Sequence, residues 1–167
     1  MADFRKGFTF IEVLIVVLIL GIAAALVVPQ MGQTAATKLI EAARLLAADL
    51  GEAQIESMAH GQDLRLVVFD PDHNAYQIAA ASDPDTPITN PIGNLPYRVV
   101  FGSGRARPLD GVTLQSLSVG DDDQLGFGIY GQLDQATDAT ITLACEGKTI
   151  TLTVQASTGE VTISGVD

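Results

Sequence analysis

An apolar run from Phe8 to Val28, ended by Pro29, limits what this chain can become more than any other feature. At about 1.5 Å of rise per residue, a helix over this run is roughly 30 Å long, which is the thickness of the hydrocarbon core of a bilayer. Glu12 is the only charged residue in the run. A carboxylate inside a membrane helix costs about 3 kcal/mol, so its presence indicates a partner or a function.

Two simpler kinds of membrane segment share part of this pattern. Arg5 and Lys6 place positive charge before the apolar run, as in a secretory signal peptide or a plain signal anchor. A signal peptide has an apolar core of about 7 to 15 residues followed by a small-residue cleavage site. This run is longer and ends in Val27-Val28-Pro29. A plain anchor requires neither Glu12 nor a glycine between the basic pair and an aromatic residue.

The stretch Lys6-Gly7-Phe8-Thr9-Phe10-Ile11-Glu12 resembles the class III signal of type IV pilins and type II secretion pseudopilins. The match continues without a gap to Pro29. The resemblance implies that a prepilin peptidase cleaves after Gly7 and that the new N-terminal residue, Phe8, is N-methylated. It also implies that Pro29 bends the helix.

The same resemblance gives Glu12 a role in assembly. A buried carboxylate and a buried ammonium group stabilise each other in a low dielectric, whereas either alone is costly. We therefore expect Glu12 to be the counter-charge for the α-amino group of Phe8 in a neighbouring subunit. The implied partners are prepilin peptidase, other pseudopilins or pilins in a hetero-oligomeric filament, an inner-membrane assembly platform, and membrane lipid along residues 8–28. No cofactor is implied.

The length and charge of the chain fit a small exported domain on a membrane stem. We expect four parts: a cleaved leader over 1–7, a transmembrane and filament-core helix over 8–29, its amphipathic continuation over 30–61, and a β-rich lobe over 62–167. The resemblance places the chain in the bacterial inner membrane as a single-pass protein, with the lobe in the periplasm. The net charge of −11 argues against a nucleic-acid partner, because phosphate binding needs clustered Lys and Arg.

Beyond Pro29 the helical period continues to His60-Gly61, with a polar joint around Gly32. The apolar stripe that we expect to pack on the lobe consists of Leu39, Ala42, Ala43, Leu46, Leu50, Ala53 and Ser57. The side that we expect to face solvent carries Lys38, Glu41, Arg44, Asp49, Glu52 and Glu56. The simplest interpretation is one long helix, half in the membrane and half outside it.

After Gly61 the pattern changes to a period of two, which predicts strands. The expected strands lie over 64–69, 75–80, 97–101, 112–119, 125–129, 140–145, 148–155 and 160–164. Turn residues at 70–74 and 146–147 predict hairpins and antiparallel pairing. The predicted fold is α+β, with a long N-terminal helix packed on an antiparallel β-rich lobe, as in pilins.

The segment 82–96 contains four prolines, and we expect it to form an exposed loop without regular structure. The pair Gly102 and Gly104 is expected to form a turn. Arg105 and Arg107 follow it as the only close basic pair of the lobe.

The soluble part also resembles, more loosely, the H-type minor pseudopilins of the GspH/FimT-like family. The likeness rests on three stretches: the helix end over 42–50, the hairpin over 66–76, and the tail from Gly126 to Ile163. Family members related to DNA-uptake pili have arginines near the C-terminus. This chain instead ends Gly159-Glu160-Val161-Thr162-Ile163-Ser164-Gly165-Val166-Asp167, so DNA binding is not expected.

Residues suited to catalysis or metal binding are sparse. His60 and His73 have no cysteine or second histidine at zinc-ligand spacing. The single cysteine, Cys145, lies in an alternating apolar strand pattern that favours a buried structural role. Asp70 to Asn74 and Asp121 to Asp123 offer oxygen ligands for calcium, but neither matches an EF-hand loop. We expect neither an enzyme nor a metal site, and leave calcium binding open.

Two functions remain. The first is a structural minor pseudopilin of a type II secretion system, processed by prepilin peptidase and assembled through its N-terminal helix into a periplasmic pseudopilus. The second is a minor type IV pilin that acts in pilus assembly, adhesion or DNA uptake. In the second case, the proline-rich segment 82–96 or residues 102–108 would be the contact surface.

Overall fold

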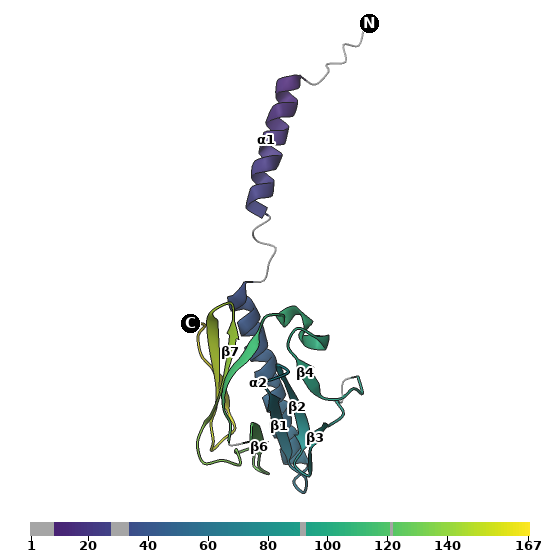
Figure 1. Ribbon diagram of the computed structural model, residues 1–167, viewed down its shortest axis with the longest axis vertical. Helices are drawn as coiled ribbons and strands as arrows, with labels where there is room; N and C mark the ends of the chain where they lie inside the picture. Colours follow the sequence, from purple (N-terminus) through teal and green to yellow (C-terminus); the bar gives the residue numbers. More distant parts are fainter. Residues whose placement is uncertain (1–8, 28–33, 91–92, 121) are drawn as a thin grey trace. The chain divides into compact units, whose positions relative to one another are not determined.

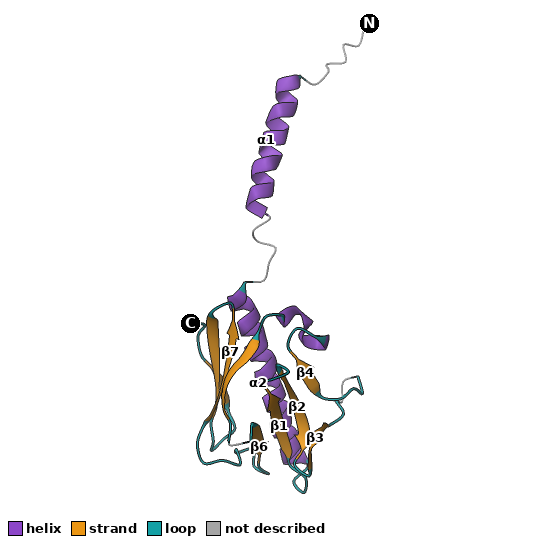
Figure 2. Ribbon diagram, in the orientation of Figure 1, coloured by secondary structure: helices purple, strands orange, loops and turns teal. Residues whose placement is uncertain are grey.

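The computed structural model describes residues 9–27, 34–90, 93–120 and 122–167 (Figures 1 and 2). The chain divides into two compact units, Met1–Thr34 and Ala35–Asp167. The first contains helix α1 (Phe10–Val27), and the second contains helix α2 (Ala35–Ala59) and the described strands. The single long helix expected from the sequence is thus described as two helices, and Thr34 belongs to neither.

Helix α1 has an almost entirely apolar sequence, with Glu12 as its one charged residue. From Phe10 to Ile22, its large apolar side chains are between 47% and 83% exposed. Within the described residues, no helix combines the length and the apolar character needed to cross a membrane.

Helix α2 follows the predicted period and ends at Ala59, next to the expected stop at His60-Gly61. Every residue of the predicted apolar stripe, from Leu39 to Ser57, is buried. The prediction for the opposite side is wrong at Asp49, which is only 3% exposed. Asp49 lies between Leu46 and Leu50 on the helical period, and this places its carboxylate on the packed face.

The lobe holds two antiparallel sheets. The first has the order β3-β2-β1-β6, with β4 also paired to β2; the second has the order β5-β7-β8-β9. The strands of the first sheet are β1 (Arg65–Asp70), β2 (Ala75–Ala80), β3 (Asp83–Pro87), β4 (Arg98–Val100) and β6 (Gln124–Phe127). Those of the second are β5 (Thr113–Ser118), β7 (Ala139–Cys145), β8 (Lys148–Val154) and β9 (Val161–Ile163).

The eight predicted strands are all present, and both predicted hairpins are confirmed. β1 pairs with β2 across residues 71–74, and β7 pairs with β8 across Glu146 and Gly147. Glu146 and Gly147 both have positive φ, at 50° and 80°. Two central residues with positive φ form a turn whose twist matches that of the flanking strands, which explains the tight connection.

One helix and two sheets share a single core. α2 packs against β1 and β6 of the first sheet and against β7, β8 and β9 of the second (Figure 1). The largest fully buried side chains come from all three layers: Tyr76, Phe127, Leu39, Leu46, Leu50, Ile78, Leu125, Ile141, Leu143 and Leu152. The predicted α+β architecture, a helix packed on an antiparallel β-rich lobe, is therefore confirmed.

The expectation of a structureless loop over 82–96 is wrong in its first part. Asp83–Pro87 forms β3, which pairs with the end of β2 through a bulge between Ala79 and Ala80. Gln77 reinforces this edge by donating its side-chain amide to the Pro84 carbonyl at 2.9 Å. Proline is tolerated in an edge strand because its missing N–H is not needed on the unpaired side. Four prolines therefore restrict this segment to the edge of the sheet without preventing pairing.

Candidate functional site

The first candidate site is the start of α1. The Glu12 backbone N–H donates to the Thr9 hydroxyl at 3.3 Å, and the Thr9 backbone N–H donates to the Glu12 carboxylate at 3.4 Å. This reciprocal pair is a capping box, with Thr9 at the N-cap position and Glu12 three residues later. The Glu12 side chain also lies in the first turn, at the positive end of the helix dipole, where acidic residues stabilise a helix. Glu12 thus has a local structural role that sequence reasoning missed, although the T-x-x-E spacing was visible.

The other residues predicted for this site are Gly7 and Phe8 at the cleavage point and Pro29 at the helix bend. All three lie outside the described residues. Glu12 is exposed, and among the described residues its side chain hydrogen-bonds to Thr9, at the start of its own helix.

The second candidate site is a polar cluster around Asp49, buried between α2 and the lobe. The Tyr76 hydroxyl donates to the Asp49 carboxylate at 2.6 Å, and the Tyr97 hydroxyl donates to its other oxygen at 2.9 Å. Arg105 forms an ion pair with the same carboxylate, and its guanidinium lies 5.0 Å from the centre of the Tyr97 ring. Asp49 therefore joins α2, β2, the segment before β4, and the 3-10 helix η2 (Gly104–Leu109).

The electrostatics of this cluster favour neutral tyrosines and a charged arginine. Burial and the adjacent Asp49 carboxylate raise the pKa of Tyr97 to about 12, and the same two causes raise the pKa of Tyr76. Burial is the largest single influence on Arg105 and acts to lower its pKa, but the Asp49 charge, Tyr76 and Tyr97 together outweigh burial and raise that pKa above its usual value. Both hydroxyls thus stay donors at neutral pH, and the buried carboxylate keeps a full set of partners.

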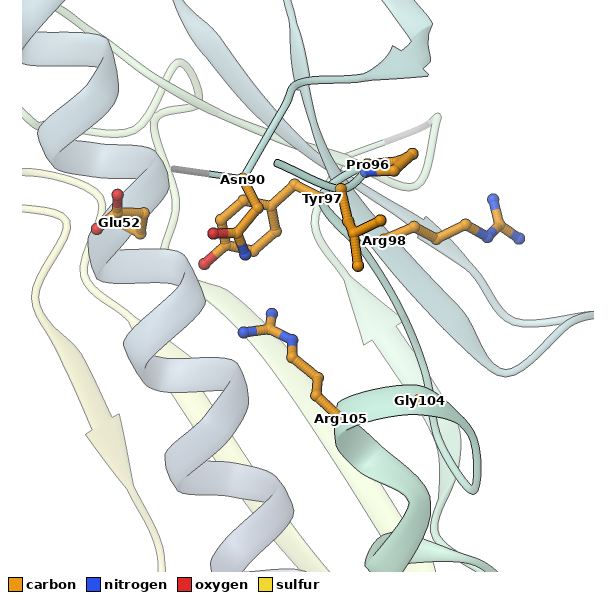
Figure 3. Close-up of a pocket in the computed structure, with 8 residues that line it drawn as sticks. Glu52, Asn90, Pro96, Tyr97, Arg98, Gly104 and Arg105 are labelled. Atoms are coloured by element: carbon orange, nitrogen blue, oxygen red, sulfur yellow. The ribbon is translucent and has the colours of Figure 1, made fainter. Parts of the chain in front are cut away.

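The basic pair predicted as a contact surface is divided by this arrangement. Arg105 points toward α2 (Figure 3) and forms an ion pair with Asp49, although part of its side chain stays exposed. Arg107 is exposed as well, and no ion pair is found for it among the described residues. The turn predicted at the preceding glycines is present, with φ of 83° at Gly102 and 51° at Gly104. It leads directly into η2, which carries Arg105 inward.

A cavity of about 470 Å³ lies beside the Asp49 cluster. Its lining residues are Glu52 of α2, the facing residues Asn90, Leu95, Pro96, Tyr97 and Arg98, and Gly104 and Arg105 of the η2 region. Figure 3 shows Tyr97 and Arg105 pointing toward α2, and the Arg98 guanidinium pointing away from it. Arg98 donates to Asp70 at 2.8 Å and to Gln77 at 3.1 Å.

Metal ligands do not converge in the part of the chain that the structure describes: no group of three or more His, Cys, Asp or Glu side chains is placed to hold an ion. His73 lies 2.9 Å from Asp70, and its hydrogen bond is the main cause that lowers the pKa of that carboxyl group. His60 contacts Glu56 at 3.2 Å. Cys145 is buried and unpaired, as expected for a structural residue.

A comparison with protein families finds a match at the N-terminus of the chain. Residues 4–28 match the model of the prokaryotic N-terminal methylation motif. No curated protein matches the chain by sequence.

Two solved structures share the fold of the chain. The minor pseudopilin EpsH from the type 2 secretion system of Vibrio cholerae aligns with a TM-score of 0.57 and 17% identity, over 77% of this chain and 97% of that one. The type IV minor pilin FimU of Pseudomonas aeruginosa aligns with a TM-score of 0.55 and 17% identity, over 75% of this chain and 87% of that one. The chain thus carries the prokaryotic N-terminal methylation motif and shares its fold with a minor pseudopilin and a minor type IV pilin.

Proposed function

We propose that the chain is a structural minor pseudopilin of a type II secretion system. In this proposal, prepilin peptidase removes residues 1–7, Phe8 becomes the N-methylated N-terminus, and residues 8–29 first anchor the precursor in the inner membrane. The lobe lies in the periplasm, and α1 then enters the core of a short filament with other pseudopilins on an inner-membrane platform. The protein has no catalytic role in this process.

The observation that carries the proposal is the combination of two independent likenesses in one chain. The methylation motif covers residues 4–28, and 77% of the chain shares its fold with 97% of the solved chain of EpsH, a minor pseudopilin of a secretion system. The exposed apolar surface of α1 supports an assembly role, because side chains such as Leu18 and Leu20, both more than 60% exposed, gain most from being covered by lipid or by other helices.

The proposal is tested by cross-linking native membranes and purifying a tagged form of the chain. Mass spectrometry then identifies the co-purifying proteins and the N-terminal peptide of the chain. We expect an N-methylated peptide that begins at Phe8, together with other pseudopilins and secretion-platform proteins. A chain that retains Met1 or Ala2 would contradict the pilin-like processing itself.

The counter-charge role of Glu12 needs a variant that leaves the helix start intact. Glu12→Ala removes both the charge and the capping box, whereas Glu12→Gln keeps an acceptor at the capping position and removes only the charge. We expect both variants to enter the membrane and both to lose filament assembly. Normal assembly of Glu12→Gln would show that Glu12 acts through the capping box and not through its charge.

The alternative is a minor type IV pilin acting in pilus assembly, adhesion or DNA uptake. It is favoured by the likeness to FimU, whose TM-score differs from that of EpsH by only 0.02. The same purification separates the two functions, because pilus retraction or DNA-uptake proteins would then replace secretion-platform proteins.

A further inference from the structure

The cavity beside α2 contains one charged side chain, Glu52, that forms no ion pair with any residue that the structure describes. Its two cations are already engaged, Arg98 with Asp70 and Arg105 with Asp49. Glu52, on α2, lines the same cavity, and the described structure gives its carboxylate neither a hydrogen bond nor an ion pair. The balance of charge in the cavity is therefore negative, in a place where the surrounding protein partly excludes water.

Much of the cavity wall apart from Glu52 is apolar. It includes Leu95, Pro96 and the ring of Tyr97, and Tyr97 points toward α2 (Figure 3). A ligand that fits these surroundings has an apolar stem, which lies along the wall, and a positive head, which reaches the carboxylate. Lys and Arg side chains have this construction.

We propose that this cavity binds a Lys or Arg side chain of a partner protein, with Glu52 as the carboxylate that receives the positive head. The rim of the cavity favours a protein over a small free cation. Leu95 is 67% exposed there, and an exposed leucine beside a charged cavity contributes to binding only if the ligand extends past the opening. The chain around the bound side chain provides that extension.

The proposal concerns the lobe and is independent of which filament the chain joins. Its test therefore measures binding of a defined probe and not assembly. Failure of filament assembly would leave this proposal standing, and failure of probe binding would leave the proposed function standing.

The experiment is a titration of the full-length, ¹⁵N-labelled chain in an uncharged detergent, followed by NMR. The probes are Nα-acetyl-arginine amide and Nα-acetyl-lysine amide, and the matched neutral probe is Nα-acetyl-citrulline amide. We expect saturable shifts at the amides of Glu52, Leu95 and Arg105, with a Kd of about 1–10 mM, as befits a single side chain. The citrulline probe has nearly the shape of arginine without its charge, and we expect it to bind at least about tenfold more weakly.

Three variants test the assignment of residues. Glu52→Gln removes the charge at constant size, and we expect it to weaken binding of both cationic probes about tenfold or more. Glu160→Gln removes one exposed carboxylate outside the cavity, and we expect unchanged affinity. Leu95→Ser is expected to weaken binding a few-fold, because it removes apolar contact at the rim. Unchanged spectra away from the cavity confirm that each variant is folded.

Three results would overturn the proposal. Equal binding of the citrulline probe would show that charge is not recognised. Unaltered affinity in Glu52→Gln would show that the carboxylate is not the receiving group. Binding of putrescine without binding of either blocked amino acid would identify a site for small free amines, since only the blocked amino acids carry a peptide backbone.

Discussion

Helix α1 and the lobe are constrained by their sequences in opposite ways. Residues 4–28 match a sequence model, although the large apolar side chains of α1 from Phe10 to Ile22 are about half exposed or more. The lobe has a fully buried core, but its fold is shared with EpsH and FimU at only 17% identity. A core requires apolar residues of suitable volume at suitable positions, and many sequences meet that requirement. Under the proposed function, the particular residues of the N-terminal segment are instead required by the peptidase that processes it and by the neighbouring helices in the filament.

The largest expected effect contrasts one leucine from each region. Leu46 of α2 is fully buried and Leu18 of α1 is 64% exposed. We expect Leu46→Ala to lower the free energy of unfolding of the lobe by about 2–5 kcal/mol, because it leaves a cavity in the core. We expect Leu18→Ala to change it by less than about 0.5 kcal/mol.

Tyrosine fluorescence during urea unfolding of the full chain in detergent measures this contrast. All three tyrosines, Tyr76, Tyr97 and Tyr130, belong to the lobe, and the chain has no tryptophan. The signal therefore reports the lobe alone. A loss of lobe stability in Leu18→Ala would show that α1 and the lobe are coupled in folding. The expectation that the lobe is stabilised by its own core alone would then be wrong.

The second prediction concerns the polar centre of the lobe. Asp49→Ala removes the acceptor of the buried Tyr76 hydroxyl and of the Tyr97 hydroxyl. We expect a loss of about 2–3 kcal/mol, mainly from unsatisfied hydroxyl groups. The ion pair adds little, because the Arg105 side chain is 39% exposed and can turn to water.

Asp49→Asn is the matched control, because it keeps one carbonyl oxygen as an acceptor at nearly the same size. We expect it to lose less stability than Asp49→Ala in the same urea experiment. Equal losses would mean that the charge of Asp49, and not its hydrogen bonds, stabilises the lobe.

The fold could be predicted from the sequence where the signal is local. The buried stripe of α2 runs from Leu39 to Ser57, and buried residues alternate with less buried ones along β7 and β8. Each pattern arises because a single helix or strand turns one face to the core, so it is visible in a short stretch of sequence. Both hairpins follow from turn residues within a few positions of each other. In these places the neighbours along the chain determine the structure.

The sequence failed where the determining partner is distant in the chain. Asp49 is buried because Tyr76, Tyr97 and Arg105, which are 27, 48 and 56 residues away, converge on it. β3 forms because β2 offers a free edge, which the proline count of the segment does not reveal. Similarly, Glu52 is half-buried and lines a cavity together with the segment before β4 and η2, which its place on the helical period does not reveal.

The third prediction tests how closely the lobe is packed around Gln54. This side chain donates to the carbonyls of Gly131 at 2.7 Å and Thr158 at 2.8 Å. A Cβ atom at Gly159, where φ is 69°, would collide with the Gly131 carbonyl and the Gln54 amide. Gly147 has a similar φ of 80°, but open space around it.

Both Gly→Ala variants place an alanine in the left-handed region, which lowers the free energy of unfolding by about 1–2 kcal/mol. We expect Gly159→Ala to lose about 1–2 kcal/mol more than Gly147→Ala, because only the former also forces packed groups apart. Urea unfolding followed by tyrosine fluorescence measures the difference. Equal losses would indicate that the loops held by Gln54 adjust without cost.

The smallest expected effect returns to α1 and tests whether the start of that helix is stabilised by its own residues. Thr9→Ala removes the N-cap hydroxyl that accepts the Glu12 N–H, and we expect a local loss of about 1 kcal/mol. Amide hydrogen exchange at residues 10–13 of the full chain in detergent should become about fivefold faster. Thr9→Ser keeps the hydroxyl and should leave exchange unchanged, and lobe unfolding should be unchanged in both variants. If Thr9→Ala had no effect on exchange, the surrounding detergent and not the Thr9 hydroxyl would stabilise the first turn of α1. The T-x-x-E spacing would then be explained by the proposed processing and assembly of this segment and not by helix capping.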